Sequence, residues 1–486
     1  MSKLPVLILQ MQRMGDLVLS FPLLSRLREA LPGTPLWVVG EPQFFKPLLP
    51  LSPQATYFSY DSAPDLKGNV FHMVINLSFR PEAAAMARRA RTDRLIGPWA
   101  DDNGRLFIAG DWQLYRASLT HNNRYNRYHW ADLNVLDALA PDRALVDDWL
   151  KPRPILPSLV TPGGAGLRLG LFLGASEAEK RPNASFWAGL AKILMNAGHK
   201  PVLLGGRAET DLGREVAHLL GAGAPNMTGR FSVAALAQFI GELDLLVTPD
   251  TGPMHIASGL GTPVLNLSMG PVNPWETGPS APGHHVLRPA LDCTGCWRCT
   301  QESVRCREEF THSKVAAVIE RLLTGEAFPQ TPPMRRRMRG LEILRTARDE
   351  NGLYRLDSLL SGGYGSTTEF EARPALARFW QSWFGELFGF LPQGDAGKAW
   401  AHVRERHPLL AGELAEAAAA FALELARTFR TSPGDILASP RFWQQGAPIV
   451  QPLSGYIQMY AQNALGSREA FLHVLSLAES VAELSV

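Results

Sequence analysis

The sequence has almost no net charge, no long apolar run and only four cysteines among its 486 residues. Lys and Arg total 48 and Asp and Glu total 46, so the net charge of +2 gives no reason to expect nucleic acid as a partner. No segment has the roughly 20 consecutive apolar residues of a membrane-spanning helix, and the N-terminus shows no secretory signal pattern. Hydrophobic residues make up 46% of the chain, so we expect a cytoplasmic globular protein with a large core.

The chain is too long for one ordinary domain, and its first part alternates between strand-like and helix-like segments. Apolar runs at 6–11, 35–40 and 71–78 read as buried strands, with helical patterns between them. This alternation predicts a largely parallel α/β sheet. A Pro/Gly-rich stretch at 151–166 reads as an interdomain linker, after which the alternation restarts. We therefore predict two doubly wound domains facing across a cleft.

After Gly325 the sequence becomes helical in pattern, and we expect a mostly α-helical C-terminal extension of unknown role at 331–486. It opens with a basic linker, followed by a hairpin turning at Asn351-Gly352. An aromatic stripe then falls on one helical face, which favours core packing over membrane-interface docking. The stripe consists of Leu376, Phe379, Trp380, Trp383, Phe384, Leu387 and Phe388.

Three loops of the second predicted domain combine glycine with polar side chains where strands end, which is where open α/β sheets bind ligands. In the first loop, Gly174 and Ser176 offer backbone N–H groups and a hydroxyl, and Lys180 adds a cation. This set suits a phosphate, although a solvated loop with a helix cap also accounts for it. In "LLGGRAETD", Gly205 admits a close backbone approach and Glu209 is available for ribose hydroxyls.

The third loop, "TPDTGPMHIASGLGTP", opens a helix directly after a strand. Asp250 lies at the strand end, Thr251-Gly252 opens the turn, and His255 falls in the first helical turn. Asp250 or Thr251 could cap the helix, but a cap leaves His255 without a role. In the first domain, Gly15-Asp16 likewise lies between a strand and the helix that follows it. Asp16 could cap this helix, and it could also take part in catalysis.

These motifs, in this order, resemble glycosyltransferase family 9, the ADP-heptose:lipopolysaccharide heptosyltransferases with the GT-B fold. The resemblance runs from Val6 to Leu323 and rests on "QMQRMGDLVLSFPLL", "LGASEAEKRP", "LLGGRAE", the block from "TPDTGPMH" to "GPVNPWETGP", and the cysteines that follow it. It implies two Rossmann-like domains, an acceptor domain at 1–158 and a donor domain at 159–330. Pro249 departs from the small polar residue that the family more often has.

The resemblance also implies roles for particular residues. Asp16 would be the general base of an inverting transfer, with Gly15, Gly174 and Gly205 giving close backbone approach. The donor, expected to be ADP-heptose or another ADP-sugar, would contact Ser176, Lys180, Glu209, Asp250, Thr251, Gly252 and His255. The acceptor would be a glycan or glycolipid like the lipopolysaccharide core, with peripheral contact at the cytoplasmic face of the inner membrane. No cofactor is required, and the sequence has no Asp-x-Asp metal motif.

Other functions fit the same fold. The donor could be another nucleotide-sugar, the acceptor could be a protein, or the enzyme could be a nucleotide-sugar epimerase. A non-catalytic glycan-binding scaffold is disfavoured, because Asp16, Lys180 and His255 are all present.

The four cysteines, Cys293, Cys296, Cys299 and Cys306, lie within one short segment. Such clustering indicates a reducing compartment and not a disulfide scaffold. Two interpretations stay open. The spacing suits a structural zinc or iron–sulfur centre, and it also suits a reduced, metal-free loop.

Overall fold

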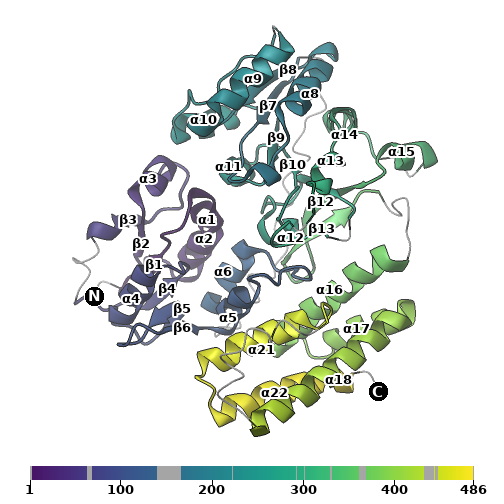
Figure 1. The fold of residues 1–486 in the computed structure, drawn as a ribbon. Coiled ribbons are helices and arrows are strands. Elements are labelled where there is room, and N and C mark those ends of the chain that lie inside the picture. The colour runs from purple at the N-terminus through teal and green to yellow at the C-terminus, as the bar shows by residue number, and fades with distance from the viewer. Residues whose placement is uncertain are drawn as a thin grey trace.

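The computed structural model describes residues 3–62, 68–139, 166–221, 223–291, 293–299, 301–328, 331–360, 368–431, 443 and 447–484. The predicted linker lies, except for Gly166, outside the described residues. Figure 1 shows two α/β lobes and a bundle of C-terminal helices. We call them the first lobe (3–139), the second lobe (166–360) and the extension (368–484).

The first lobe is built on a six-stranded sheet in the order β3-β2-β1-β4-β5-β6. Its first five strands run parallel, and β6 is antiparallel to β5. The central strand β1 has four apolar residues, all buried, because helices cover both faces of a parallel sheet. The strands are β1 Val6–Leu9, β2 Leu36–Gly40, β3 Thr56–Ser59, β4 Met73–Asn76, β5 Leu95–Ala100 and β6 Leu106–Ala109. The helices are α1 Met14–Leu19, α2 Phe21–Ala30, α3 Pro42–Phe45, η1 Lys46–Leu48, α4 Pro81–Arg89, α5 Asp111–Ser118 and α6 Trp130–Leu139.

The second lobe has a seven-stranded sheet in the order β13-β12-β11-β10-β9-β7-β8. Strands β7 to β11 are parallel, and β12 and β13 form the predicted hairpin, which joins antiparallel to β11. The strands are β7 Arg168–Phe172, β8 Lys200–Leu204, β9 Leu245–Pro249, β10 Val264–Leu267, β11 His285–Pro289, β12 Leu341–Arg348 and β13 Tyr354–Ser358. The helices are η3 Ala178–Lys180, α8 Ala184–Asn196, η4 Arg207–Glu209, α9 Thr210–Leu220, α10 Val233–Ile240, α11 Gly252–Leu260, α12 Pro274–Thr277, α13 Arg305–Glu308, α14 His312–Thr324 and α15 Pro332–Arg337.

Local sequence fixes many of the helix ends. The side chain of Asn183 accepts a hydrogen bond from the backbone N–H of Phe186 at the start of α8, and Ser232 and Thr311 cap α10 and α14 in the same way. Helix α11 ends at Gly261, whose φ of 78° is the left-handed conformation that glycine adopts without strain.

Each sheet has one point at which the strand order reverses, and the loops with the candidate site residues follow the strands at this point. In the first sheet, β1 lies between β2 and β4; in the second, β7 lies between β8 and β9. Ligands of open α/β sheets bind beyond the carboxyl ends of strands at such switch points. Asp16 follows β1, the Gly174 loop follows β7 and Asp250 follows β9. The fold therefore directs all three toward the region between the lobes.

The extension packs against the first lobe and shares its hydrophobic core. Its helices are α16 Thr368–Leu387, α17 Asp395–Arg406, α18 Pro408–Thr431, α21 Gln451–Asn463 and α22 Arg468–Glu483. Rings of α16 and its C-terminal turn meet rings of α5, with centroids 4.6 Å apart for Tyr115–Phe384 and 4.8 Å apart for Trp112–Phe388. Burying such a ring stabilises the fold by about 1.5–3 kcal/mol, so the aromatic stripe is core. Among the described helices, none combines the length and the apolar character needed to cross a membrane.

Candidate active site

The loop after β1 and the first turn of α11 meet face to face between the lobes. A Cβ placed on Gly15 would lie 3.4 Å from Cδ2 of His255 and 3.8 Å from Cα of Gly252. A Cβ on Gly252 would in turn lie 3.0 Å from Cε of Met14. Two glycines therefore allow the approach of α1 and α11 that Figure 1 shows.

Asp16 is half-buried in the first turn of α1. Burial raises its pKa above the ordinary value of 3.8, and the charge of Arg116 opposes part of that rise. Backbone N–H groups of Arg13 and Asp16 also favour the carboxylate, as expected at a helix N-terminus. The Asp16 carboxylate can therefore stabilise the N-terminus of α1 and also accept a proton in the region between the lobes.

Asp250 sits across from Asp16 at the end of β9. Burial raises its pKa to about 6, while a hydrogen bond from Thr277 and the charge of Lys180 lower it and the charge of Asp16 raises it. The Thr277 hydroxyl donates to Oδ2 of Asp250 at 2.7 Å. Asp16, Lys180 and Asp250 are thus close enough to interact electrostatically, although they come from separate strands and both lobes.

Lys180 ends the short helix η3, and its ammonium group pairs with Glu177 at 2.9 Å. The backbone of Glu179-Lys180 packs against Gly270, where an added Cβ would lie only 2.7 Å from the Glu179 carbonyl oxygen. Gly270 has a φ of 77°, a conformation that also requires glycine. The packing against Gly270 therefore fixes the backbone at Lys180. Its ammonium group can leave Glu177 and bind the anion of a ligand.

Gly174, Gly205 and Glu209 form one packed unit at the same edge of the second sheet. A Cβ on Gly174 would lie 2.6 Å from Cδ of Glu209, and one on Gly205 would lie 2.8 Å from its Cβ. The Glu209 carboxylate accepts a hydrogen bond from the backbone N–H of Gly206 at 2.8 Å and lies 3.7 Å from Arg181. Ser176 is exposed on the neighbouring loop.

Helix α11 supplies Thr251, Gly252 and His255. Thr251 is the N-cap residue, yet its side chain makes no capping hydrogen bond, so capping does not account for it. His255 is buried, and burial with the nearby His129 lowers its pKa to about 3. The imidazole is therefore neutral and can offer a hydrogen bond without adding charge.

Two buried charged residues of the site were not singled out from the sequence. Arg116 lies on α5, whose residues 112–118 are all buried, with its guanidinium 4.9 Å from the Trp130 ring centroid. Burial lowers the pKa of Arg116, and the charges of Asp16 and Glu276 raise it. Burial raises the pKa of Glu276 to about 7. No sequence signal marks Arg116, because the α5 sequence DWQLYRAS mixes polar and apolar residues and only the packing of the fold buries it.

The four cysteines are free and half-buried beside this site. Burial, with the charges of the other three thiols, raises the pKa of Cys296 to about 11, and Cys306 Sγ accepts a hydrogen bond from Gly270 N–H at 3.2 Å. Within the described residues, no group of three or more His, Cys, Asp or Glu side chains is arranged to hold a metal ion. The zinc or iron–sulfur alternative therefore has no support in the structure.

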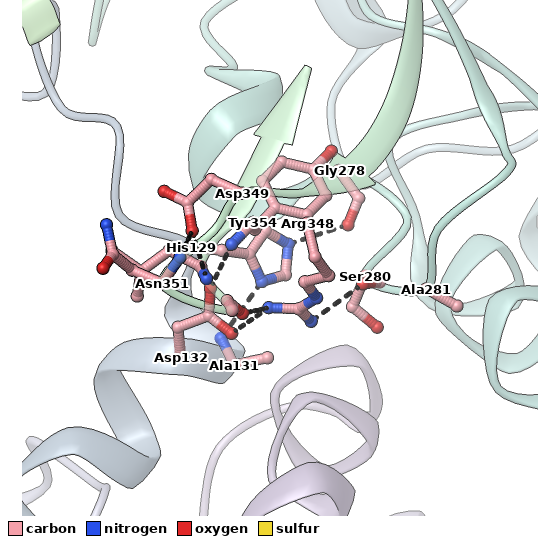
Figure 2. Close-up of polar contacts among 12 residues, drawn as sticks. His129, Ala131, Asp132, Gly278, Ser280, Ala281, Arg348, Asp349, Asn351 and Tyr354 are labelled. Atoms are coloured by element: carbon pink, nitrogen blue, oxygen red, sulfur yellow. Dashed lines mark hydrogen bonds and ion pairs between the residues drawn. The ribbon is translucent and has the colours of Figure 1, made fainter. Parts of the chain in front are cut away.

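A buried polar cluster joins the two lobes next to this site (Figure 2). Asp132 of α6, only 1% exposed, pairs with Arg348 at 2.6 Å and accepts a hydrogen bond from Tyr354 N–H at 2.8 Å. Arg348 also donates to the Ser280 carbonyl at 3.1 Å. His129 accepts from Ala131 N–H at Nδ1, so its Nε2–H donates to the Gly278 carbonyl at 2.9 Å. The hairpin β12–β13 thereby ties the second sheet to α6.

Comparison with known proteins identifies this architecture. The Escherichia coli ADP-heptose lipopolysaccharide heptosyltransferase II structure superposes with a TM-score of 0.50 at 20% identity, covering 66% of this chain and 99% of that one. The fold is therefore GT-B, with a helical extension. Lipooligosaccharide heptosyltransferase 2 of Campylobacter jejuni (strain 81116) is 29% identical over 164 residues, which are 32% of this chain and 51% of that protein. Lipopolysaccharide heptosyltransferase 2 of Salmonella typhimurium LT2 is 32% identical over 106 residues, 21% of this chain and 30% of that protein.

The family model for glycosyltransferase family 9 (heptosyltransferase) matches residues 166–304, which hold Lys180, Asp250 and His255. This region of the chain is therefore similar to glycosyltransferase family 9. The matched sequence spans about half the length of the Campylobacter relative.

Proposed function

We propose that the protein is an inverting glycosyltransferase that moves a sugar, heptose from ADP-heptose, to a hydroxyl of a lipopolysaccharide-core-like glycan. The proposal rests chiefly on the packing of the Gly15-Asp16 turn against the Gly252–His255 turn. This packing brings a carboxylate of one lobe to the ligand-binding edge of the other. The relatives are named for lipooligosaccharide or lipopolysaccharide heptosyl transfer, which supports the choice of sugar and acceptor.

In the proposed reaction, Asp16 removes the proton from the acceptor hydroxyl, whose oxygen then attacks the anomeric carbon. The bond from that carbon to the nucleoside diphosphate breaks, and the configuration inverts. Lys180 and the backbone N–H groups around Gly174 offset the charge of the departing diphosphate. Glu209 binds the ribose, and Asp250, Thr251 and His255 hold the sugar and phosphates. We place the enzyme in the cytoplasm, with peripheral contact at the inner membrane where its glycolipid acceptor lies.

The experiment that tests the proposed function compares nucleotides. We expect ADP-sugar to raise the melting temperature of the protein more than UDP- or GDP-sugar at equal concentration, since only a bound ligand stabilises the folded state. An assay for nucleotide released in the presence of the glycan acceptor then measures transfer. Conversion of the nucleotide-sugar without an acceptor into a stereoisomer would instead show an epimerase, and no binding of any nucleotide would contradict the proposal.

Two carboxyl groups should shape the acidic side of the pH–rate profile, Asp250, whose pKa burial raises to about 6, and Asp16, and only the latter has Arg116 among the charges that shift its pKa. A protonated Asp16 cannot accept the acceptor proton, so kcat/KM falls as the pH falls through its pKa, which burial places above 3.8. His255 stays neutral above a pH of about 3, so it adds no transition near its ordinary 6.5. Because the positive charge of Arg116 lowers the pKa of Asp16, Arg116→Gln should move the acidic limb to higher pH and Arg116→Lys should restore it. An acidic limb unmoved in Arg116→Gln would contradict the assignment.

A further inference from the structure

The short helix α12 of the second lobe is held by the first lobe through two hydrogen bonds to Asn123. The side-chain amide of Asn123 donates to Oε2 of Glu276 at 2.6 Å, and the side-chain amide of Asn273 donates to the backbone carbonyl of Asn123 at 2.8 Å. All three side chains are buried, with at most 4% exposed. Hydrogen bonds made away from water are costly to lose, because the freed group stays unsatisfied.

Helix α12 has only four residues, too few to hold itself in place, and its other groups are also fixed from outside. The Tyr354 hydroxyl donates to the Pro274 carbonyl at 3.2 Å, and the Trp275 ring lies 4.0 Å from the Arg127 guanidinium. His129 holds the Gly278 carbonyl just after the helix, as Figure 2 shows. The position of α12 is therefore set by residues of the first lobe and of the β12–β13 hairpin.

Helix α12 contacts one carboxylate of the candidate active site directly, that of Asp250. Thr277, its last residue, donates to Asp250 at 2.7 Å. Glu276 and Asp16 both interact with the charge of Arg116, which lies on α5 of the first lobe. Asn123 donates to Oε2 of Glu276, and the Trp130 indole also interacts with this carboxylate, so two groups of the first lobe orient it.

From this arrangement we propose that Asn123 and Glu276 are an interlobe pair of positioning residues for sugar transfer. The pair holds α12 in place, and through Thr277 it sets the position of Asp250 relative to the first lobe, which carries the base Asp16. Neither residue touches the reacting atoms. The inference rests on the proposed function, since it assigns the pair to that reaction.

The test is the split between kcat and KM in matched variants of the full chain. We expect Glu276→Ala and Asn123→Ala to lower kcat about 10- to 100-fold, the scale of a small misplacement of reacting groups, with KM for the nucleotide-sugar within about 3-fold. Glu276→Gln keeps an oxygen that accepts the Asn123 bond and should recover part of the rate. Asn463→Ala is the control, because it removes two part-buried hydrogen bonds that join α21 to Ile108 of the edge strand β6. It should lower the melting temperature and leave kcat unchanged.

The outcomes separate this inference from the function it rests on. The positioning role is overturned if kcat is unchanged in both Glu276→Ala and Asn123→Ala. It is also overturned if the losses of kcat scale with the fall in melting temperature as they do in Asn463→Ala. In both cases the glycosyltransferase assignment stands. A wild-type protein that binds no nucleotide-sugar and transfers none overturns the proposed function, and this inference with it.

Discussion

Asp16→Asn should lower kcat for sugar transfer by about 10²–10⁴-fold, the usual contribution of a general base, while nucleotide binding stays unchanged. The asparagine keeps the shape of the side chain but cannot accept the acceptor proton. Asp16 lies on the first lobe, whereas the expected nucleotide contacts lie on the second. Calorimetric titration with ADP, next to an initial-rate assay, measures both quantities on one sample.

Glu82→Gln is the matched control for this variant. Glu82 is an exposed carboxylate in the first turn of α4, so its removal takes away a helix-end charge without touching the interlobe region. If Asp16 serves its helix alone, both variants should lose only about 0.3–1 kcal/mol of stability and keep their rates. Full turnover in Asp16→Asn would therefore remove Asp16 as the base and leave it a helix-stabilising residue.

Lys180→Met should weaken binding of ADP about 10- to 100-fold and lower kcat as well, because a charge-assisted hydrogen bond contributes about 1.5–3 kcal/mol. Its ammonium group interacts with the charge of Asp250 and pairs with Glu177, whose side chain is about half exposed. A bound diphosphate would replace that partner. Titration with ADP and initial rates measure the two effects.

Lys200→Met provides the comparison for Lys180. Lys200 is exposed at the first residue of β8, so it lies at the edge of the sheet opposite to the strand ends that carry the site. The two substitutions change the charge of the second lobe equally. If both variants weaken ADP binding equally, the effect of Lys180 is a general electrostatic one. If Lys180→Met has no effect on ADP binding, Lys180 does not bind the phosphate.

The features that the sequence predicted correctly are those with a local cause. The hairpin at Asn351-Gly352 follows from its turn chemistry: Asp349 accepts hydrogen bonds from Asn351 N–H at 2.9 Å and Leu353 N–H at 2.8 Å, and Gly352 takes a φ of 70°. Buried parallel strands such as β1 and β9 appear as apolar runs because both faces are covered. Asp250 and the Gly174 loop could be placed because loops after parallel strands share one edge.

Short edge strands and long-range pairs could not be predicted in this way. β3 and β6 are four-residue edge strands without fully buried residues, so they have no continuous apolar run to mark them. Asn123 and Glu276 are 153 residues apart, and only the docking of the two lobes brings them together. The aromatic stripe of α16 was expected to be core, but its partners Trp112 and Tyr115 carry no sequence signal that points to it.

The central claim is that one site between the lobes holds the diphosphate at Lys180 and faces Asp16 toward the transferred sugar. The most direct measurement is a crystal structure of the protein with ADP bound. We predict the diphosphate against Lys180 and the Gly174 loop, the ribose at Glu209, and the terminal phosphate directed toward the space between His255 and Asp16. ADP bound elsewhere would contradict the account. So would ADP bound with its terminal phosphate too far from the Asp16 carboxylate for one sugar to lie between them.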